Sequence, residues 1–340
     1  MSVITTDAAG DAATEAKAAH KVDRGVGPYR LAWKRLRRDR TALILGGVFV
    51  VIVLLCALAP LYAKYVAHTG PNTNHITEQI KVNGRLTDVI SLDGTPIGPT
   101  WSSRFFLGAD PNGRDVAVRL LYGGRTSLEI GFVAAFIAIF FATVVGMAAG
   151  FFRGAVDSVL SRLMDLLWAY PALLLGIALG TSLAVGGLNL GLFSIKGNSL
   201  AVPMFVIGIV GIPYVSKPIR AQVLVLRERE FVDAARIRGA SSLRIIVSEI
   251  LPNVTSTIIV FFPLVLALSI LLESGLSFLG AGVQPPSASW GTMISQGINL
   301  IPGSIHLTFA PGLMLVLAVV GINALGDGLR DAFDPRSTKR

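Results

Sequence analysis

Long apolar runs alternate with shorter polar segments along most of this chain. Six runs contain no Asp, Glu, Lys or Arg, and they cover residues 41–60, 130–152, 166–185, 200–216, 254–272 and 307–325. A helix needs about 20 apolar residues to cross a bilayer, and a charged side chain at its centre costs roughly 2.5–3.5 kcal/mol of insertion free energy. The pattern therefore predicts an all-α membrane protein with six transmembrane helices.

Basic residues are distributed unevenly between the polar segments. The segments 1–40, 153–165, 217–253 and 326–340 contain 22 of the 30 Lys and Arg residues, whereas the alternate segment 273–306 contains none. Short loops rich in Lys and Arg remain on the cytoplasmic side of a membrane. We therefore expect a multi-pass protein of the cell membrane (inner or plasma membrane) with both its N- and C-termini cytoplasmic.

This topology divides the chain into five parts. Residues 1–40 form a basic cytoplasmic N-terminus, which we expect to be partly disordered because residues 1–27 lack periodicity. The first transmembrane helix, at 41–60, leads into an external segment at 61–129. There, alternating apolar and polar residues around Asn83-Gly84 and Asp93-Gly94 favour a small β-hairpin. A core domain at 130–327 holds five transmembrane helices and a cytoplasmic loop at 217–253, and residues 328–340 form a cytoplasmic tail.

The residue types typical of enzymes do not form a site. Cys56 is the single cysteine, and the four histidines are far apart, so we expect no metal site. Residues 321–326 have the glycine spacing of a phosphate-binding loop, but Asp327 stands where that loop requires Lys. The net charge of +9 is scattered between apolar runs, which argues against nucleic-acid binding. We expect no catalytic residue and no cofactor on this chain.

The predicted spans offer few candidates for a transport path. Their apolar cores lack ionisable residues, which argues against a proton- or ion-coupled carrier. Glu273, at the outer end of the fifth span, is the nearest candidate, although an interfacial end residue is the favoured interpretation. The G-xxx-G spacings at Gly146–Gly150 and Gly176–Gly180 indicate close helix packing.

The segment 230–254, EFVDAARIRGASSLRIIVSEILPNV, is unusually polar for this chain. Phe231, Ala234, Ala235 and Arg238 share one helical face, which the two alanines make flat. Gly239 is suited to the left-handed conformation that ends a helix.

A second helix is predicted to follow, capped by Ser241 or Ser242. It carries an apolar stripe, and Pro252 then opens the fifth span. The pattern predicts a helix–turn–helix elbow at the membrane surface. An ordinary amphipathic connector fits the spacing equally well.

The elbow resembles the cytoplasmic loop signature of ABC-importer permeases, Glu-Ala-Ala, three residues, Gly, nine residues, Ile-x-Leu-Pro. Asp233-Ala234-Ala235, Gly239 and Leu251-Pro252 match it, whereas Asp233 replaces Glu and Glu249 replaces Ile. Four further stretches, 105–128, 150–179, 273–293 and 325–336, resemble the C-type permease of dipeptide and oligopeptide importers. The resemblance runs from about residue 28 to 336, except at 67–100, which is longer than usual.

This resemblance implies a permease that pairs with a homologous B-type permease as a heterodimer. It also implies two ATPase subunits that bind ATP and Mg, an extracellular or periplasmic solute-binding protein, and a peptide substrate crossing the lipid bilayer. The elbow would insert into a groove of the ATPase. The residues that the resemblance assigns to this coupling are Glu230, Phe231, Asp233, Ala234, Ala235, Arg238, Gly239, Leu251 and Pro252.

Other interpretations remain open from the sequence. A permease of the same type could carry a metal chelate, a glutathione-like peptide or a sugar. A secondary carrier or channel would transport without ATP, and a membrane scaffold would leave the elbow without a partner.

Overall fold

A computed structural model describes residues 33–82, 84–189 and 194–333. The predictions for residues 1–32, for Asn83 and for residues 334–340 lie outside this part of the chain. The elements run in the order α3 (Arg40–Ala57), α4 (Ala59–Tyr62), η1 (Ala63–Ala67), β1 (Gln79–Val82), β2 (Arg85–Asp88), α5 (Val116–Phe152), α6 (Gly154–Ala169), α7 (Ala172–Gly186), β3 (Leu188–Asn189), β4 (Ser194–Ile195), α8 (Ala201–Leu226), α9 (Glu230–Ile237), α10 (Ser242–Ile245), η2 (Ile246–Ile250), α11 (Leu251–Phe278), α12 (Trp290–Gly297), η3 (Ile298–Leu300), α13 (Ile301–Ser304) and α14 (His306–Phe333).

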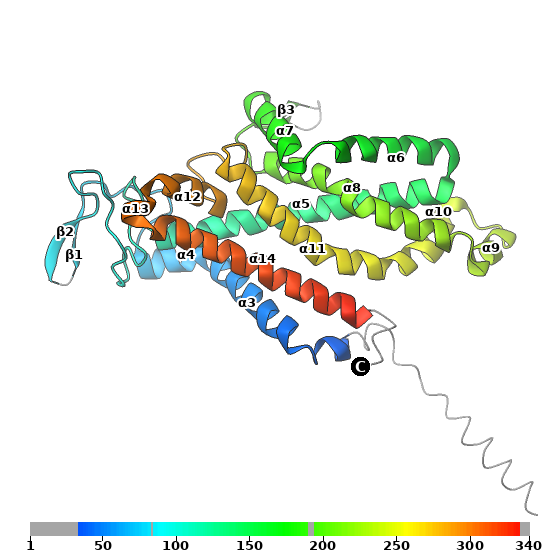
Figure 1. The fold of residues 1–340 in the computed structure, drawn as a ribbon, viewed down its shortest axis with the longest axis horizontal. Helices are drawn as coiled ribbons and strands as arrows, with labels where there is room; N and C mark the ends of the chain where they lie inside the picture. The colour runs from blue at the N-terminus through cyan, green and yellow to red at the C-terminus, as the bar shows by residue number, and fades with distance from the viewer. Residues whose placement is uncertain (1–32, 83, 190–193, 334–340) are drawn as a thin grey trace, which may run out of the picture.

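The fold is an elongated helical bundle, which confirms the predicted class (Figure 1). Helices α5, α8 and α11 run side by side, with α3 and α14 packed together on one flank and the α6–α7 arm on the other. The β1–β2 hairpin and the helix α9 lie at opposite ends of the bundle. The start of α3 and the end of α14 lie toward the α9 end, as the predicted topology requires.

Five described helices are long and apolar enough to cross a membrane, counting α10–α11 as one, and α6 with α7 would supply a sixth crossing. The span predicted at 166–185 is interrupted in the structure, where α6 and α7 meet at an angle of 92°. Pro171 has no N–H to donate, and it disfavours the helical conformation for the preceding residue. Tyr170 is accordingly extended, with φ −96° and ψ 140°.

Three other helices are longer than their apolar runs. Helix α5 begins at Val116 rather than near residue 130, and α8 continues through Lys217 and Arg220 to Leu226. The predicted second helix of the elbow is continuous with the fifth span, from Ser242 to Phe278. Hydropathy detects the part of a helix that crosses the hydrocarbon core, and it does not report where the helix ends.

Close backbone packing holds the central helices together, as the glycine spacings predict. A Cβ atom at Gly146 would lie 2.8 Å from the Ser216 carbonyl oxygen, and one at Gly150 would lie 2.9 Å from the Arg220 carbonyl oxygen. Only glycine allows α5 and α8 to approach this closely at these two positions.

The predicted hairpin is also confirmed. Strands β1 and β2 pair antiparallel from Gln79↔Asp88 to Val82↔Arg85 around the predicted turn, where Gly84 has φ +84°. At the second predicted turn, Gly94 has φ +82°. The Asp93 carboxylate there accepts a hydrogen bond from the Thr95 N–H at 3.2 Å.

Candidate coupling site

The elbow begins where α8 ends and the chain reverses direction into α9. Arg229 is extended, with φ −88° and ψ 148°, and α9 runs from Glu230 to Ile237. Gly239 has φ +77°, its N–H donates to the Arg236 carbonyl at 2.9 Å, and the Ala240 N–H donates to the Ala235 carbonyl at 3.1 Å. These two bonds form the Schellman motif that ends a helix at a left-handed residue, as predicted for Gly239.

Helix α9 turns a different face outward from the one that the sequence predicts. Ala235, at 1% exposure, is buried with Val232 in the main apolar core. The prediction that Ala235 shares an exposed flat face with Ala234 is therefore wrong. One exposed row of α9 lies at positions i, i+3, i+4 and i+7 counted from Glu230, and its members are Glu230, Asp233, Ala234 and Ile237.

Ile237 is the exposed elbow residue that the sequence pattern missed. Its side chain is 87% exposed, whereas Phe231 is 36% exposed and lies at the edge of the outward row. The sequence signal that could have marked it is an apolar residue in a polar segment, two positions before Gly239. Single exposed apolar residues are common on protein surfaces, so Ile237 by itself does not identify a partner.

The second helix of the elbow divides its apolar stripe between core and surface. Ser241 caps α10, and its hydroxyl accepts the Arg244 N–H at 3.4 Å. Ile246 and Ile250 are buried, but Leu243 is 71% exposed. Val247 lies outward as well. The predicted stripe is therefore a core contact on one side and an extension of the exposed elbow surface on the other.

Leu251 and Pro252, the last two residues assigned by the resemblance, lie at the start of α11. Leu251 packs against the main core, and Pro252 is exposed. Pro252 directly follows η2 within the helix that runs without a break from Ser242 to Phe278, so the prediction that it opens the fifth span is wrong. These two residues set the path of the helix rather than its outer surface.

Ion pairs fix the geometry of the elbow. Asp233 pairs with Arg236 at 3.0 Å within α9. Arg238 faces Glu249 at 3.9 Å across a cavity of about 300 Å³ that separates the turn from α10. Glu249 thus stands where the general signature has Ile because here it faces a basic residue of the turn.

A second set of contacts ties the elbow to the central helices. Glu228, just before α9, pairs with Arg153 at 2.9 Å and with Arg227 at 3.3 Å. The Arg227 guanidinium also donates to the Phe151 carbonyl at the end of α5. The ends of α5 and α8 are therefore joined directly behind α9, so a displacement of α9 acts on both helices.

Glu273 is fully buried and belongs to a polar network rather than to an open path. The Ser277 hydroxyl donates to its Oε1 at 2.7 Å, and the Ser274 hydroxyl donates to its Oε2 at 3.3 Å. The Ser127 hydroxyl of α5 also faces it and accepts the Trp290 N–H at 3.1 Å. Glu273 is therefore out of contact with water in this structure and joins α5, α11 and α12, and its place relative to a membrane interface or a solute path stays a prediction.

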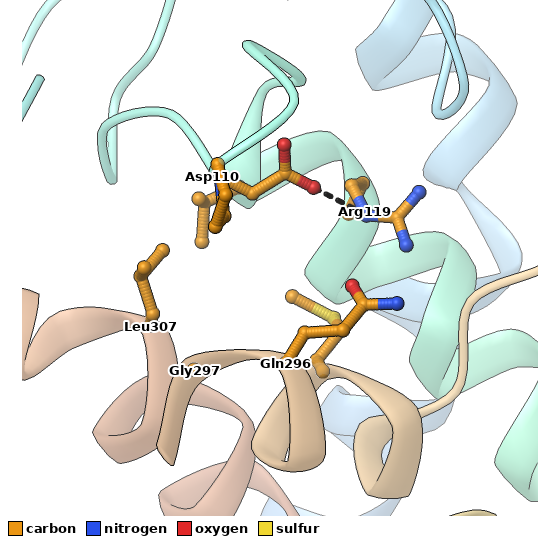
Figure 2. A pocket seen from close by; sticks show the side chains of 8 residues that line it. Asp110, Arg119, Gln296, Gly297 and Leu307 are labelled. Atoms are coloured by element: carbon orange, nitrogen blue, oxygen red, sulfur yellow. Dashed lines mark ion pairs between the residues drawn. The ribbon is translucent and has the colours of Figure 1, made fainter. Parts of the chain in front are cut away.

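A buried polar cluster joins the segment before α5 to α12 (Figure 2). The Arg119 guanidinium pairs with Asp110 at 3.3 Å and donates to the Pro71 carbonyl at 3.0 Å. Gln296 extends from α12 toward the same space and accepts a bond from Arg114 at 3.4 Å. The cavity here measures about 10 Å³, enough for about one water molecule. This cluster is a structural anchor, too small for a transported solute.

The described residues do not supply a metal or nucleotide site. No three His, Cys, Asp or Glu side chains within them are grouped so as to hold a metal ion. Residues 321–326 are helical within α14, and a Cβ atom at Gly321 would lie 2.7 Å from the Leu45 carbonyl. Gly321 thus serves the contact between α14 and α3, and Gly326 lies against Pro263 of α11, so these helical glycines do not form a loop that could hold phosphate.

Comparison with known proteins agrees with this architecture. The family described as "Binding-protein-dependent transport system inner membrane component" matches residues 142–339, and "N-terminal TM domain of oligopeptide transport permease C" matches residues 27–78. A dipeptide transport system permease protein DppC of Alkalihalophilus pseudofirmus is 34% identical over 92% of this chain and 91% of its own length. A glutathione transport system permease protein GsiD of Pectobacterium atrosepticum is 32% identical over 91% of each chain.

A solved structure shares the fold at low sequence identity. A chain of the MetNI methionine ABC transporter, described as inward facing, superposes with a TM-score of 0.50 at 16% identity. The match covers 63% of this chain and 96% of that one. Together with a family match over more than half of the sequence, the helical bundle and its elbow lead to one conclusion. The chain belongs to the binding-protein-dependent transport system inner membrane components, and it is a permease of the ABC-importer type.

Proposed function

We propose that this chain is one permease of an ATP-driven importer, and that α9 is the element through which ATPase subunits act on it. The single observation that carries this proposal is the exposed row of α9, which ends in Ile237 and is backed by a buried Val232–Ala235 face. Because one face of α9 is anchored in the core and the other is free for a partner, a movement of either the partner or the bundle would displace the other. The ATP and Mg would be bound by the partner subunits.

Short peptides are the proposed cargo. Relatives that share about a third of their residues with this chain over nearly its full length are named for dipeptide, di/tripeptide and glutathione transport. Each of these solutes is a small molecule with a peptide bond and charged groups. A permease of this size would form half of the path and would pair with a homologous permease.

The protein is proposed to lie in the inner or plasma membrane. The α9 end of the bundle and both termini would face the cytoplasm. The basic segments 1–40 and 217–253 support this side. The β1–β2 end would then face outward, where a solute-binding protein delivers the cargo.

The test is Ala234→Trp in the complete importer reconstituted in liposomes, with Ala234→Ser as the matched small control. Ala234 is exposed, so the bulky side chain leaves the bundle intact but blocks a close-fitting groove. We expect ATP-driven peptide uptake to fall by at least about tenfold, equivalent to 1.4 kcal/mol of coupling, with an unchanged unfolding temperature. Ala234→Ser should transport normally.

Two outcomes would contradict the proposal. One is wild-type uptake by Ala234→Trp. The other is gradient-driven uptake by this chain alone, without ATPase subunits, which would identify a secondary carrier. Thr87→Trp is a control for the bulk of the new side chain, because Thr87 is exposed in β2 at the opposite end of the bundle. This variant should leave copurification of the ATPase subunits unaffected.

A further inference from the structure

The break between α6 and α7 lies within an apolar stretch that otherwise has the composition of a membrane span. Pro171 caps α7 without a side-chain hydrogen bond to its first N–H groups. Helix ends leave backbone groups unsatisfied, and such groups are tolerated at membrane depth only inside protein or beside a water-filled cavity. The break therefore needs protein or water around it at membrane depth, and the structure has a cavity beside it.

This first cavity measures about 580 Å³ and lies between the break, α8 and α11. Three aromatic residues line it, Trp168, Tyr170 and Tyr214, and Ser269 contributes a hydroxyl. The Trp168 and Tyr214 rings are stacked, with centroids 6.2 Å apart and an interplanar angle of 20°. Stacked aromatic faces with few polar groups are typical of small-molecule sites.

A second cavity, of about 390 Å³, follows along the same helices toward α9 and has a different lining. It is lined by Asp165, Lys217 and Arg220 together with small residues of α5. The Lys217 Nζ lies 2.8 Å from Asp165 and 4.5 Å from the centroid of the Trp168 ring. Lys217 and Trp168 therefore stand between the aromatic cavity and the charged one.

We propose that these two cavities form this chain's part of the solute path, and that Trp168, Lys217 and Asp165 form a selective constriction for zwitterionic short peptides. This inference rests on the proposed function. A peptide offers an ammonium group at one end and a carboxylate at the other. The aromatic faces and Asp165 attract the ammonium, and Lys217 attracts the carboxylate, whereas the Arg220 guanidinium is already held by both carboxylate oxygens of Asp157.

The constriction opens by exchange of partners. The peptide carboxylate replaces Asp165 on Lys217, and the freed Asp165 carboxylate receives the ammonium group. Both side chains are partly exposed, Lys217 at 43% and Asp165 at 60%, so each can turn toward a solute. A lipid tail or an apolar helix of a partner permease offers neither charge.

Cysteine accessibility in the complete reconstituted importer tests the path. Cys56 is the only native cysteine and is buried, so it contributes little background. Ala169→Cys, in the first cavity, should react at least tenfold faster with a charged membrane-impermeant thiol reagent than Val316→Cys, which is exposed on α14 away from the cavities. Saturating dipeptide should slow the reaction at position 169. Equal rates at the two positions, or no protection by dipeptide, would overturn the proposal, because lipid or a partner helix would then fill the cavity.

Selectivity tests the constriction itself. The wild type should prefer a dipeptide with a free carboxylate over its C-terminal amide, and Lys217→Met should reduce that preference at least fivefold, mainly through KM. Lys64→Met is the matched control, because Lys64 also lies over an aromatic ring, that of Tyr65 at 5.1 Å, but lines neither cavity. An unchanged preference in Lys217→Met would overturn the constriction. Absence of ATP-driven peptide uptake by the wild type would instead contradict the proposed function.

Discussion

At the scale of single residues, the elbow shows that neighbouring positions with similar side chains have different roles. Ala234 and Ala235 are adjacent alanines, yet one is exposed and the other is buried among core side chains. A large residue at Ala235 would have to displace the core, whereas a large residue at Ala234 would project away from it, toward the proposed ATPase partner. Experiments on the coupling role therefore belong at Ala234, and changes at Ala235 report on folding.

Gly239 has room for a side chain, but its backbone conformation favours glycine. A Cβ atom there would meet nothing within 4 Å, but φ is +77°. Gly239→Ala should therefore cost about 1 kcal/mol of local stability from the backbone alone, and Gly239→Asn should cost less because Asn tolerates this region. Amide hydrogen exchange at Ala240, whose N–H closes the turn, should accelerate about fivefold in Gly239→Ala. Equal exchange in both variants would show that the turn is held by other contacts.

At the scale of elements, the α6–α7 arm depends on one proline. Replacing Pro171 by Ala restores an N–H and frees Tyr170 to become helical. We expect the 92° bend to open and the distance between spin labels at Ser158 and Ser182 to increase. Pro311→Ala in α14, which is a single unbroken helix, should leave that distance unchanged. An unaltered distance in Pro171→Ala would mean that packing against α8 and α11 holds the bend.

The segment that holds the β1–β2 hairpin has a pH dependence of its own. Hydrogen bonding to Arg104 lowers the pKa of Glu78, with bonds of 2.6 and 3.0 Å between them. A lowered pKa stabilises the folded segment above the ordinary pKa of a glutamate, and this contribution is lost as the pH falls through the lowered value. The protection of the β1 and β2 amides against hydrogen exchange, measured relative to the intrinsic exchange rate at each pH, should therefore be lower at pH 3 than at pH 7. Glu78→Gln should remove most of this difference, and an undiminished difference would assign it to another group.

At the scale of the whole molecule, α8 connects the proposed functions. It carries Tyr214 and Lys217 beside the two cavities, and it ends at the elbow. Its packing on α5 passes through Gly146 and Gly150, where the two helix backbones lie in close contact. A displacement at α9 would therefore reach the cavity walls through this pair of helices.

This coupling predicts that α5 and α8 tolerate no added volume where they meet. Gly150→Val should force the helices apart and cost about 1–3 kcal/mol, which overpacking typically costs. Gly47→Val in α3 is the control, because a Cβ atom there meets nothing within 4 Å. Thermal unfolding in detergent should separate the two variants. Equal unfolding temperatures would mean that α8 can shift without penalty.

The sequence alone determined the membrane class, most of the helices, the hairpin and the turn at Gly239. Insertion free energy is a sum over residues, and a turn or a proline acts on its immediate neighbours, so such features are readable locally. Only the tertiary structure decided which face of α9 is outward, that Glu273 is buried among serines, and that the break at Pro171 opens onto a cavity. Each of these depends on contacts between helices far apart in the chain, and no local pattern contains them.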